Sequence, residues 1–357
     1  MGEPCHSALF EEAIQVSRID SHTYSAYLDP VWCIGSVPHG GYTTSVLYRL
    51  ATVHCRKNND GKGPWRASSE PVAFQLSFLR RTLAGHAILK VQDMKVGLRT
   101  SVIHVALLQP SDHANSRVTK SNAGDRDEIL EVKLVAYITV SPPTFEESTP
   151  FRGPWELHPP PAPGSLPNGS IDFDSLAQNG VDGAWAKYHD QPLILSAARQ
   201  LEVYEPTVPP AATIADLASR TIDQWSRFTP GGKVARWSNE SVLFLIDMFP
   251  PAFDRLEAME RRRMLAAAEE ACEADVAKKQ FWFASVAMNI DLRTRIPHEG
   301  VEWLHTRVVS RMVRGSRADL DVMVLDQSGQ AIALGTQISL VVDQGRNTKG
   351  RTSTEKL

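Results

Sequence analysis

One acidic residue, Asp247, lies within a run of almost entirely apolar residues, 242–249. Burying an ionised carboxylate is costly unless it is paired or has a chemical task. Residues with capping side chains precede the run and a proline pair follows it, which predicts a short buried helix over 239–249. In the last turn of such a helix, burial and the helix dipole both oppose the negative charge and make the carboxylate a better proton acceptor. Asp247 is therefore a candidate general base, and the alternative is a structural aspartate bonded to backbone amides or to an arginine.

A second candidate is the tetrapeptide His39-Gly40-Gly41-Tyr42, which precedes a stretch with helical spacing. Apolar side chains at positions 46, 47, 50, 51 and 53 fall on one face of that helix. The glycine pair permits close backbone approach at the helix N-terminus, where amide groups could receive a carbonyl oxygen or an oxyanion. The alternative is a tight loop that binds no ligand.

Length and composition limit the class of protein. A chain of 357 residues predicts two domains or one large double one. Hydrophobic residues at 42% and charged residues at 22% are typical of a soluble globular enzyme. A formal charge of -3, without a basic stripe, argues against nucleic acid or an anionic membrane as partner.

Neither a targeting segment nor a metal motif stands out. The N-terminus lacks the basic start and apolar region of a signal peptide, and no apolar run reaches the length of a membrane span. We therefore expect a cytoplasmic protein, with a weak peroxisomal hint in the C-terminal Thr-Glu-Lys-Leu, which differs from Ser-Lys-Leu at one position. The cysteines lack metal-ligand spacing, which predicts free thiols in a reducing compartment and no metal site. They are Cys5, Cys33, Cys55 and Cys272.

The two halves of the chain have the same order of patterns. Each has a predicted strand pair, then a helix, then a meander of long strands. In the first half these patterns cover 8–29, 45–53 and the strands 72–79, 87–91, 100–108 and 129–140. In the second half they cover 198–204 and 221–228, the Asp247 helix, a helical insert over 253–279 and a meander over 281–342.

A short echo supports duplication. Gly97-Leu98-Arg99 leads to Gln109, and Gly315-Ser316-Arg317 leads to Gln327 at the same separation. Nine prolines between Pro142 and Pro167 predict an extended linker between the halves. The predicted organisation is an N-terminal unit over 1–141, a linker over 142–183, a C-terminal unit over 184–345 and a flexible tail over 346–357.

This arrangement resembles the double hotdog, an α+β fold in which each half wraps a curved antiparallel sheet around a central helix. The first half resembles the acyl-CoA thioesterase-like proteins at His39-Gly40-Gly41-Tyr42, at residues 78–85, at Gly97-Leu98-Arg99-Thr100-Ser101 and at Gln109. The second half is similar to bacterial acyl-CoA thioesterase II in its Asp247 helix, at Phe283-Ala284-Ser285, at Glu302-Trp303-Leu304 and over residues 326–337.

The resemblance implies a catalytic set of Asp247, Ser285 and Gln337. In that family an Asp, a Thr and a Gln hold the attacking water, so Ser285 departs from the pattern by lacking the methyl group that stiffens the side chain. A carboxylate can accept the proton of the water while the hydroxyl and the amide orient it, with no covalent intermediate and no cofactor or metal. The helix of the first half lacks an acidic residue equivalent to Asp247, so we expect one site per chain.

Three functions stay open at this point. The leading one is hydrolysis of an acyl thioester, borne by CoA or by a carrier protein, in an apolar tunnel. The second is a cyclase or isomerase of Diels-Alder type that folds a polyene or terpenoid in secondary metabolism, suggested by the many aromatic residues of the second half. The third is a non-catalytic acyl-binding protein. We expect the substrate to contact His39, Gly40, Gly41, Tyr42, Trp237, Phe244 and Trp282, and we expect a homodimer by analogy with other hotdog proteins.

Overall fold

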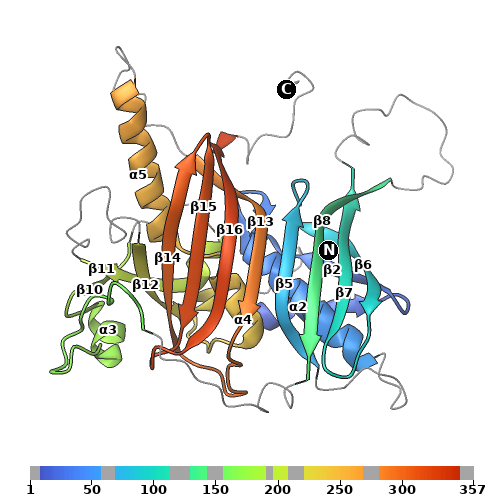
Figure 1. Ribbon diagram of the computed structural model, residues 1–357, viewed down its shortest axis with the longest axis horizontal. Helices are drawn as coiled ribbons and strands as arrows, with labels where there is room; N and C mark the ends of the chain where they lie inside the picture. Colours follow the sequence, from blue (N-terminus) through green and yellow to red (C-terminus); the bar gives the residue numbers. More distant parts are fainter. Residues whose placement is uncertain are drawn as a thin grey trace, which may run out of the picture.

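The computed structural model describes most of the chain (Figure 1). The described residues are 9–57, 69–111, 129–142, 156–189, 196–207, 221–267 and 281–345. The predicted tail, 346–357, lies outside them, as do residues 143–155 of the predicted linker and residues 268–279 of the predicted helical insert.

The N-terminal half wraps antiparallel strands around one long helix, α2 (Gly40–Lys57). Side-chain burial alternates along its strands, as expected for a sheet with one face covered. The strands of this half are β1 (Val16–Arg18), β2 (Thr23–Leu28), β3 (Cys33–Ile34), β4 (Val37–Pro38), β5 (Glu70–Phe78), β6 (Gly85–Lys95), β7 (Ser101–Pro110) and β8 (Leu130–Ser141). A short helix, α1 (Phe10–Ala13), and a 3-10 turn, Pro30–Trp32, complete it.

The C-terminal half repeats this plan around α4 (Asn239–Leu245). A reciprocal pair of hydrogen bonds between Ser238 and Ser241 caps the start of that helix. Its strands are β9 (Val181–Asp182), β10 (Trp185–Lys187), β11 (Leu201–Pro206), β12 (Thr221–Phe228), β13 (Phe281–Leu292), β14 (Trp303–Arg314), β15 (Arg317–Leu325) and β16 (Ala331–Asp343). Its other helices are α3 (Phe173–Asn179), α5 (Pro250–Ala267) and the 3-10 turns Ala197–Gln200 and Pro230–Gly232.

One continuous antiparallel sheet joins the two halves. Strands β5 and β13 pair side by side, with Phe74 opposite Ile290, and the complete sheet has 14 strands. Outward from this pair the order is β5-β8-β7-β6-β2-β1 on one side and β13-β16-β15-β14-β12-β11 on the other, where β10 and β9 extend it. The matching order confirms the predicted duplication and the α+β double hotdog fold.

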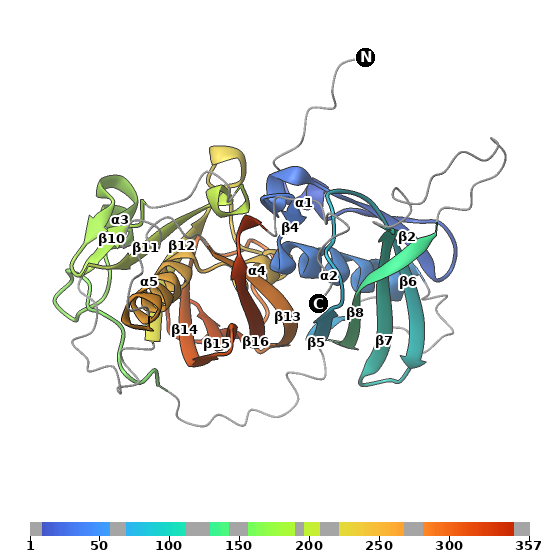
Figure 2. The same cartoon turned by 90° about the horizontal axis from the view of Figure 1, so that it is seen from above.

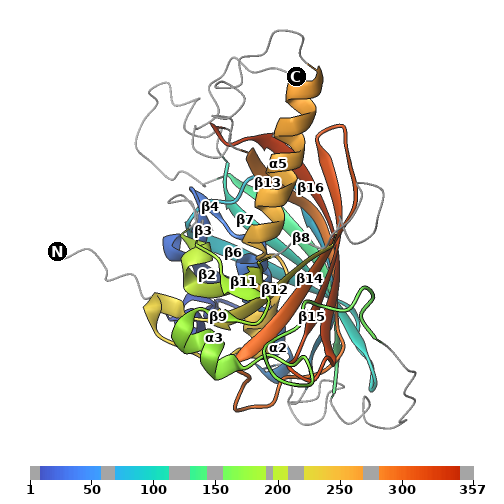
Figure 3. The ribbon, with the colours of Figure 1, turned by 90° about the vertical axis from the view of Figure 1, so that its left-hand side faces the viewer.

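The central helices lie on one side of this sheet (Figure 2). Their apolar faces form the main core, which includes Val46, Leu47 and Leu50 of α2 and Leu243 and Phe244 of α4, all fully buried. Figure 3 shows α5 running along the strands on the same side. None of the described helices is both long enough and apolar enough to cross a membrane.

Two helix boundaries differ from the prediction. Helix α4 ends at Leu245, and Asp247 lies in the turn that follows it. The proline pair does not simply end a helix, because Pro250 opens α5, where its fixed φ and missing N–H are tolerated. Near the N-terminus the predicted strand pair is shorter than expected, because residues 10–13 form α1.

Part of the predicted linker is folded. Residues 173–179 form α3, capped by the Asp172 side chain, and β9 joins the edge of the sheet. The prolines predicted an extended segment, but the residues that follow them carry apolar side chains. Among them, Leu176 belongs to a second, smaller core cluster, and Phe173 packs against that cluster. The other members of the cluster are Trp185, Tyr204, Trp225 and Trp303.

Candidate active site

Three polar side chains converge at the inner face of the C-terminal half. Gln337 donates from Nε2 to Asp247 Oδ1 at 2.8 Å and to Ser285 Oγ at 2.8 Å. Ser285 Oγ also lies 3.4 Å from Asp247 Oδ1. Asp247 is 3% exposed and Gln337 4%, so this cluster is shielded from bulk water. The structure therefore brings together the three residues that the family resemblance singled out.

The other carboxylate oxygen of Asp247 faces the N-terminus of α2. Gly41 donates its backbone N–H to Asp247 Oδ2 at 2.8 Å. A helix N-terminus carries partial positive charge, which stabilises a carboxylate. This corrects the predicted electrostatics of Asp247, because the dipole that acts on its side chain favours the negative charge. The Gly41 amide, predicted as a candidate donor to a substrate oxygen, is thus already bonded to Asp247.

Glycine is required where the two central helices meet. A Cβ atom on Gly41 would lie 2.4 Å from the carbonyl oxygen of Leu243, and one on Gly40 would lie 2.7 Å from Asp247 Oδ2. Both distances are well below contact distance. The glycine pair therefore lets α2 approach the end of α4 closely enough for the Gly41 amide to reach the carboxylate.

His39 secures the turn that carries Asp247. Its Nε2 donates to the Asp247 carbonyl oxygen at 2.9 Å, and its Nδ1 accepts from the Tyr42 N–H at 3.4 Å. Burial lowers the pKa of His39, and the neighbouring Asp247 only partly opposes that effect. A neutral imidazole with its proton on Nε2 fits both contacts. Among the residues that the structure describes, no lysine or arginine forms an ion pair with Asp247.

A β-bulge orients Ser285. In the pairing of β13 with β16, Ser285 lies opposite Ser339 and Ala287 opposite Ile338, so one extra residue is inserted between them. The bulge moves Ser285 onto the face that also carries Met288, which lies opposite Gln337. Sequence reasoning missed both the bulge and Ser339, although Ser339 follows Gln337 at the two-residue spacing of one strand face and accepts from its Nε2 at 3.0 Å.

One atom of the cluster lacks a protein partner. Gln337 Oε1 is buried, and no hydrogen-bonding group of the described residues reaches it. Buried carbonyl oxygens normally accept a hydrogen bond from protein or water. The cluster thus has a buried acceptor that the described residues leave without a hydrogen bond.

Comparison with known proteins identifies the family of the chain. The model of the acyl-CoA thioesterase N-terminal domain matches residues 28–139, and the model of the C-terminal domain matches residues 174–341. The chain belongs to the acyl-CoA thioesterase family.

The individual matches span nearly the whole chain. The thioesterase-like protein TwmA of Talaromyces wortmannii is 29% identical over 366 residues, which cover 98% of this chain and 97% of TwmA. A candidate thioesterase II from Thermobifida fusca YX matches with a TM-score of 0.60 at 16% identity, over 94% of this chain and 98% of its own. A hotdog protein of unknown function from Alicyclobacillus acidocaldarius matches with a TM-score of 0.57 at 14% identity, over 93% and 97%. At these identities the two solved structures show a shared fold only.

The other residues predicted to contact substrate in this thioesterase-family protein are mostly core residues. Tyr42 is fully buried and donates to the Ala13 carbonyl oxygen at 2.7 Å. Trp237 is fully buried and stacks on Phe228, and Phe244 packs edge-on against His39. Trp282 is half-buried on β13. Their contact with a substrate stays a prediction.

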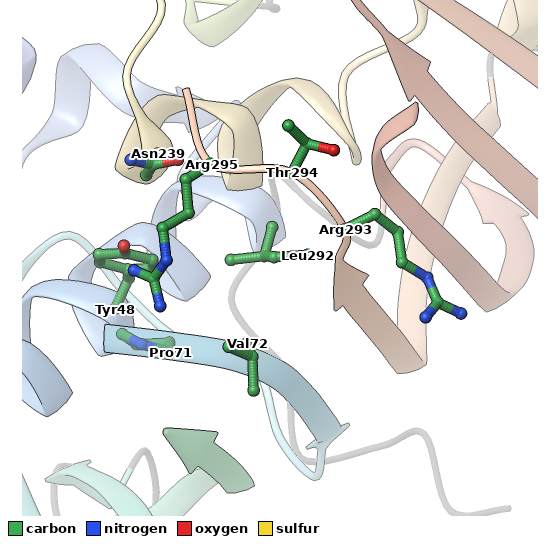
Figure 4. Close-up of a pocket in the computed structure, with 8 residues that line it drawn as sticks. All are labelled: Tyr48, Pro71, Val72, Asn239, Leu292, Arg293, Thr294 and Arg295. Carbon is green, nitrogen blue, oxygen red and sulfur yellow. The ribbon is translucent and has the colours of Figure 1, made fainter. Parts of the chain in front are cut away.

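Half-buried aromatic side chains lie near the cluster. The Phe78 ring would be 3.3 Å from a Cβ atom on Gly40, so it lies beside the Asp247 carboxylate. Phe283 of β13 stacks on Phe253 of α5 and precedes Ser285 by two residues. Two surface pockets lie elsewhere: one is lined by residues that include Tyr48 and Asn239 (Figure 4), and the other by residues that include Lys187 and Glu202.

Proposed function

We propose that this protein hydrolyses an acyl thioester and that Asp247 is the general base. The observation that carries the proposal is the buried carboxylate with two oriented partners, Gln337 and Ser285, on one oxygen and no lysine or arginine partner among the described residues. Gln337 and Ser285 can hold a water molecule against this carboxylate, which can then accept the proton of the water.

We place the attacking water beside Gln337. Its unpartnered Oε1 can accept one hydrogen of the water, while the other points at Asp247 Oδ1. The water oxygen attacks the thioester carbonyl carbon as its proton passes to Asp247. The tetrahedral intermediate then collapses, the carbon–sulfur bond breaks, and the same proton passes to the departing sulfur. The products are a carboxylic acid and a free thiol.

The oxyanion requires a donor other than Gly41, whose amide is bonded to Asp247. Gly40 stands at the first position of α2, where the helix itself supplies no acceptor for the backbone N–H. We assign the thioester carbonyl oxygen to this amide. The helix dipole then stabilises the charge that develops on the oxygen.

The acyl chain has apolar surface available next to the cluster. Phe78 lies close to Gly40. Phe283, two residues before Ser285 on β13, stacks on Phe253 of α5. An acyl group that lies against these rings keeps its carbonyl carbon near Asp247. The thioester can be borne by CoA or by a carrier protein, since both present the same linkage.

The experiment measures thiol release from a panel of acyl-CoA esters of increasing chain length. Wild-type protein should turn over at least one ester, and Asp247→Asn should reduce kcat by about 10²- to 10⁴-fold, the usual effect of losing a general base. No turnover of any ester, or an Asp247→Asn variant with full rate, would contradict the proposal.

The cyclase or isomerase alternative has less support in the fold. The aromatic residues that suggested it are dispersed, because Trp225 and Trp303 belong to the small cluster beside α3 while Trp237 lies in the main core. Phe283 remains close to Ser285. Conversion of a polyene without thiol release would favour this alternative over hydrolysis.

A further inference from the structure

Three potential metal ligands meet at the edge of the N-terminal half, away from the candidate active site. His22 follows β1, His54 lies near the end of α2, and Asp93 lies on β6. His54 Nε2 is 2.9 Å from Asp93 Oδ1, and His22 Nε2 is 3.4 Å from Asp93 Oδ2. All three ligating atoms lie within 4.8 Å of one another. His54 is thirteen residues beyond Gly41 in α2, which places it about 20 Å from the Asp247 cluster at 1.5 Å per residue.

These distances suit one small cation. Zinc binds imidazole nitrogen and carboxylate oxygen at roughly 2.0–2.2 Å, so neighbouring ligand atoms in a tetrahedral site are about 3.3–3.4 Å apart. His22 Nε2 lies at that separation from Asp93 Oδ2, and His54 Nε2 is closer to the other oxygen, Oδ1, at 2.9 Å. A pair of imidazoles with one carboxylate selects zinc and similar transition metals over magnesium or calcium, which prefer oxygen ligands.

Neighbouring groups hold the imidazoles in binding orientation. The Tyr24 hydroxyl lies 3.0 Å from His54 Nδ1, so His54 can donate from Nδ1 to this oxygen and present an unprotonated Nε2. Ser21 Oγ contacts His22 Nδ1 at 2.9 Å in the same way. Tyr24 is fully buried, which fixes the His54 ring.

The turn that carries His22 is also well defined. Asp20 Oδ1 accepts the backbone N–H groups of His22 and Thr23, both at 2.8 Å. Arg18 brings an opposing positive charge, but its Nε donates to the Asp20 carbonyl oxygen and the Asp20 carboxylate lies in the same turn. The His22 side chain is 46% exposed, so a cation can reach the cluster from solvent.

We propose that His22, His54 and Asp93 bind one Zn²⁺ with water as the fourth ligand. The ion joins the β1–β2 turn, the central helix and β6, and so fastens the outer edge of the N-terminal half to its core. The site is structural, and it is independent of the proposed hydrolysis at Asp247.

The test uses the full chain without a histidine tag, stripped with a chelator and then titrated with zinc chloride by calorimetry. Wild type should bind one Zn²⁺ per chain and melt at a higher temperature with zinc than without it. His22→Ala and Asp93→Asn should each weaken binding by at least about 100-fold, since each removes a ligand rather than an outer partner. His22 is exposed, so its replacement leaves the core intact.

Two further variants complete the design. His86→Ala is the matched control, because His86 is an exposed histidine on the same strand as Asp93, and its zinc affinity should equal that of wild type. Tyr24→Phe keeps the ring but removes the oxygen beside His54, and it should weaken binding by roughly 10-fold. Absence of zinc binding by wild type, or unchanged binding in both His22→Ala and Asp93→Asn, would overturn the proposal.

Discussion

The N-termini of the two central helices, α2 and α4, occupy equivalent positions in the two halves, but the acidic residues beside them have different partners. Helix α2 follows β2 and helix α4 follows β12, and these strands occupy matching positions in the sheet. At the start of α2 lies Asp247, which is bonded to an amide, a hydroxyl and a backbone N–H. Its carboxylate has hydrogen-bond donors, and no lysine or arginine of the described part of the chain pairs with it.

Near the start of α4, an acidic residue is paired with a cation. Glu70 forms an ion pair with Arg295 and accepts a hydrogen bond from the Tyr48 hydroxyl at 3.2 Å. Arg295 also donates to the Ser141 carbonyl oxygen at 3.1 Å, and the Asn239 side chain accepts the backbone N–H of Ile296. Figure 4 shows Arg295, Tyr48 and Asn239 around one pocket. Within the described residues, the charge of Glu70 is therefore balanced by a cation, unlike that of Asp247.

This difference is consistent with the proposal of one active site in each duplicated chain. Glu70 is linked to the start of α4 through Arg295, whose neighbour Ile296 is bonded to Asn239, so a nearby carboxylate alone does not select the base. The partners of each carboxylate differ: Glu70 is paired with Arg295, whereas Asp247 is hydrogen-bonded to Gln337 and Ser285. Variants of these residues, assayed for thiol release, show whether the difference in partners decides hydrolytic activity.

The largest effect should separate the two acids. Asp247→Asn should reduce thiol release by about 10²- to 10⁴-fold, because the base is lost. Glu70→Gln should change the rate less than about threefold, because that carboxylate takes no part in the reaction, and should alter mainly stability through its broken ion pair. Equal losses of rate in the two folded variants would remove the distinction between the halves.

Replacing the amide beside Asp247 should have the next largest effect. Gln337→Leu keeps similar volume but removes a hydrogen bond to a charged group, worth about 1.5–3 kcal/mol, and kcat should fall by roughly 10- to 100-fold. Gln75→Leu, on an exposed position of β5, is the control and should retain the wild-type rate. A Gln337→Leu variant with unchanged kcat would mean that the amide does not orient the water.

The glycine contact between the helices should be sensitive to one methyl group. Gly41→Ala places Cβ against the backbone of α4, and the strain should lower the free energy of unfolding by about 1–3 kcal/mol. The rate of thiol release should fall too, because the Gly41 amide moves away from Asp247. Asn239→Ala at the start of α4 should lower stability by about 1 kcal/mol and leave the rate intact. Denaturant unfolding combined with the thiol assay reports both values.

Stability should also depend on pH through His39. Burial lowers the pKa of His39 below its ordinary value of 6.5. Above pH 6.5 the imidazole is neutral in both states; below it the unfolded chain binds the proton first, so stability falls as pH decreases until the folded pKa is reached. The slope is at most about 1.4 kcal/mol per pH unit.

Urea unfolding at a series of pH values checks this. His39→Asn should reduce the slope without abolishing it, because burial lowers the pKa of His54 in the same direction. His86→Asn, at an exposed position, should keep the wild-type slope. A slope unchanged in His39→Asn would show that His39 is not buried in its neutral form.

The smallest effect is expected at Ser285. Ser285→Thr restores the residue type of the family pattern and keeps the hydroxyl, whose distance to Asp247 is a long 3.4 Å. We expect kcat to change less than about threefold, with the stiffer side chain favouring an increase. A steady-state comparison with Ser285→Ala, which removes the hydroxyl, decides whether that group orients the water at all.

Sequence alone could predict the duplicated fold, because alternating and helical patterns depend on local side-chain types. It could also mark Asp247, since an acid inside an apolar run is visible without coordinates. It could not predict that the Gly41 amide lies on the Asp247 carboxylate, since those residues are 206 positions apart. The bulge beside Ser285 and the folding of residues 173–182 were missed for the same reason, because both depend on neighbours distant in the chain.

The most direct test of the account is a single turnover of a good acyl-CoA substrate in water labelled with oxygen-18. Direct attack by a water held at Asp247 predicts one labelled oxygen in the released acid, one equivalent of free thiol, and no label in the peptide that contains Asp247. Label incorporated into Asp247 would instead reveal a covalent acyl intermediate, and consumption of substrate without free thiol would contradict hydrolysis itself.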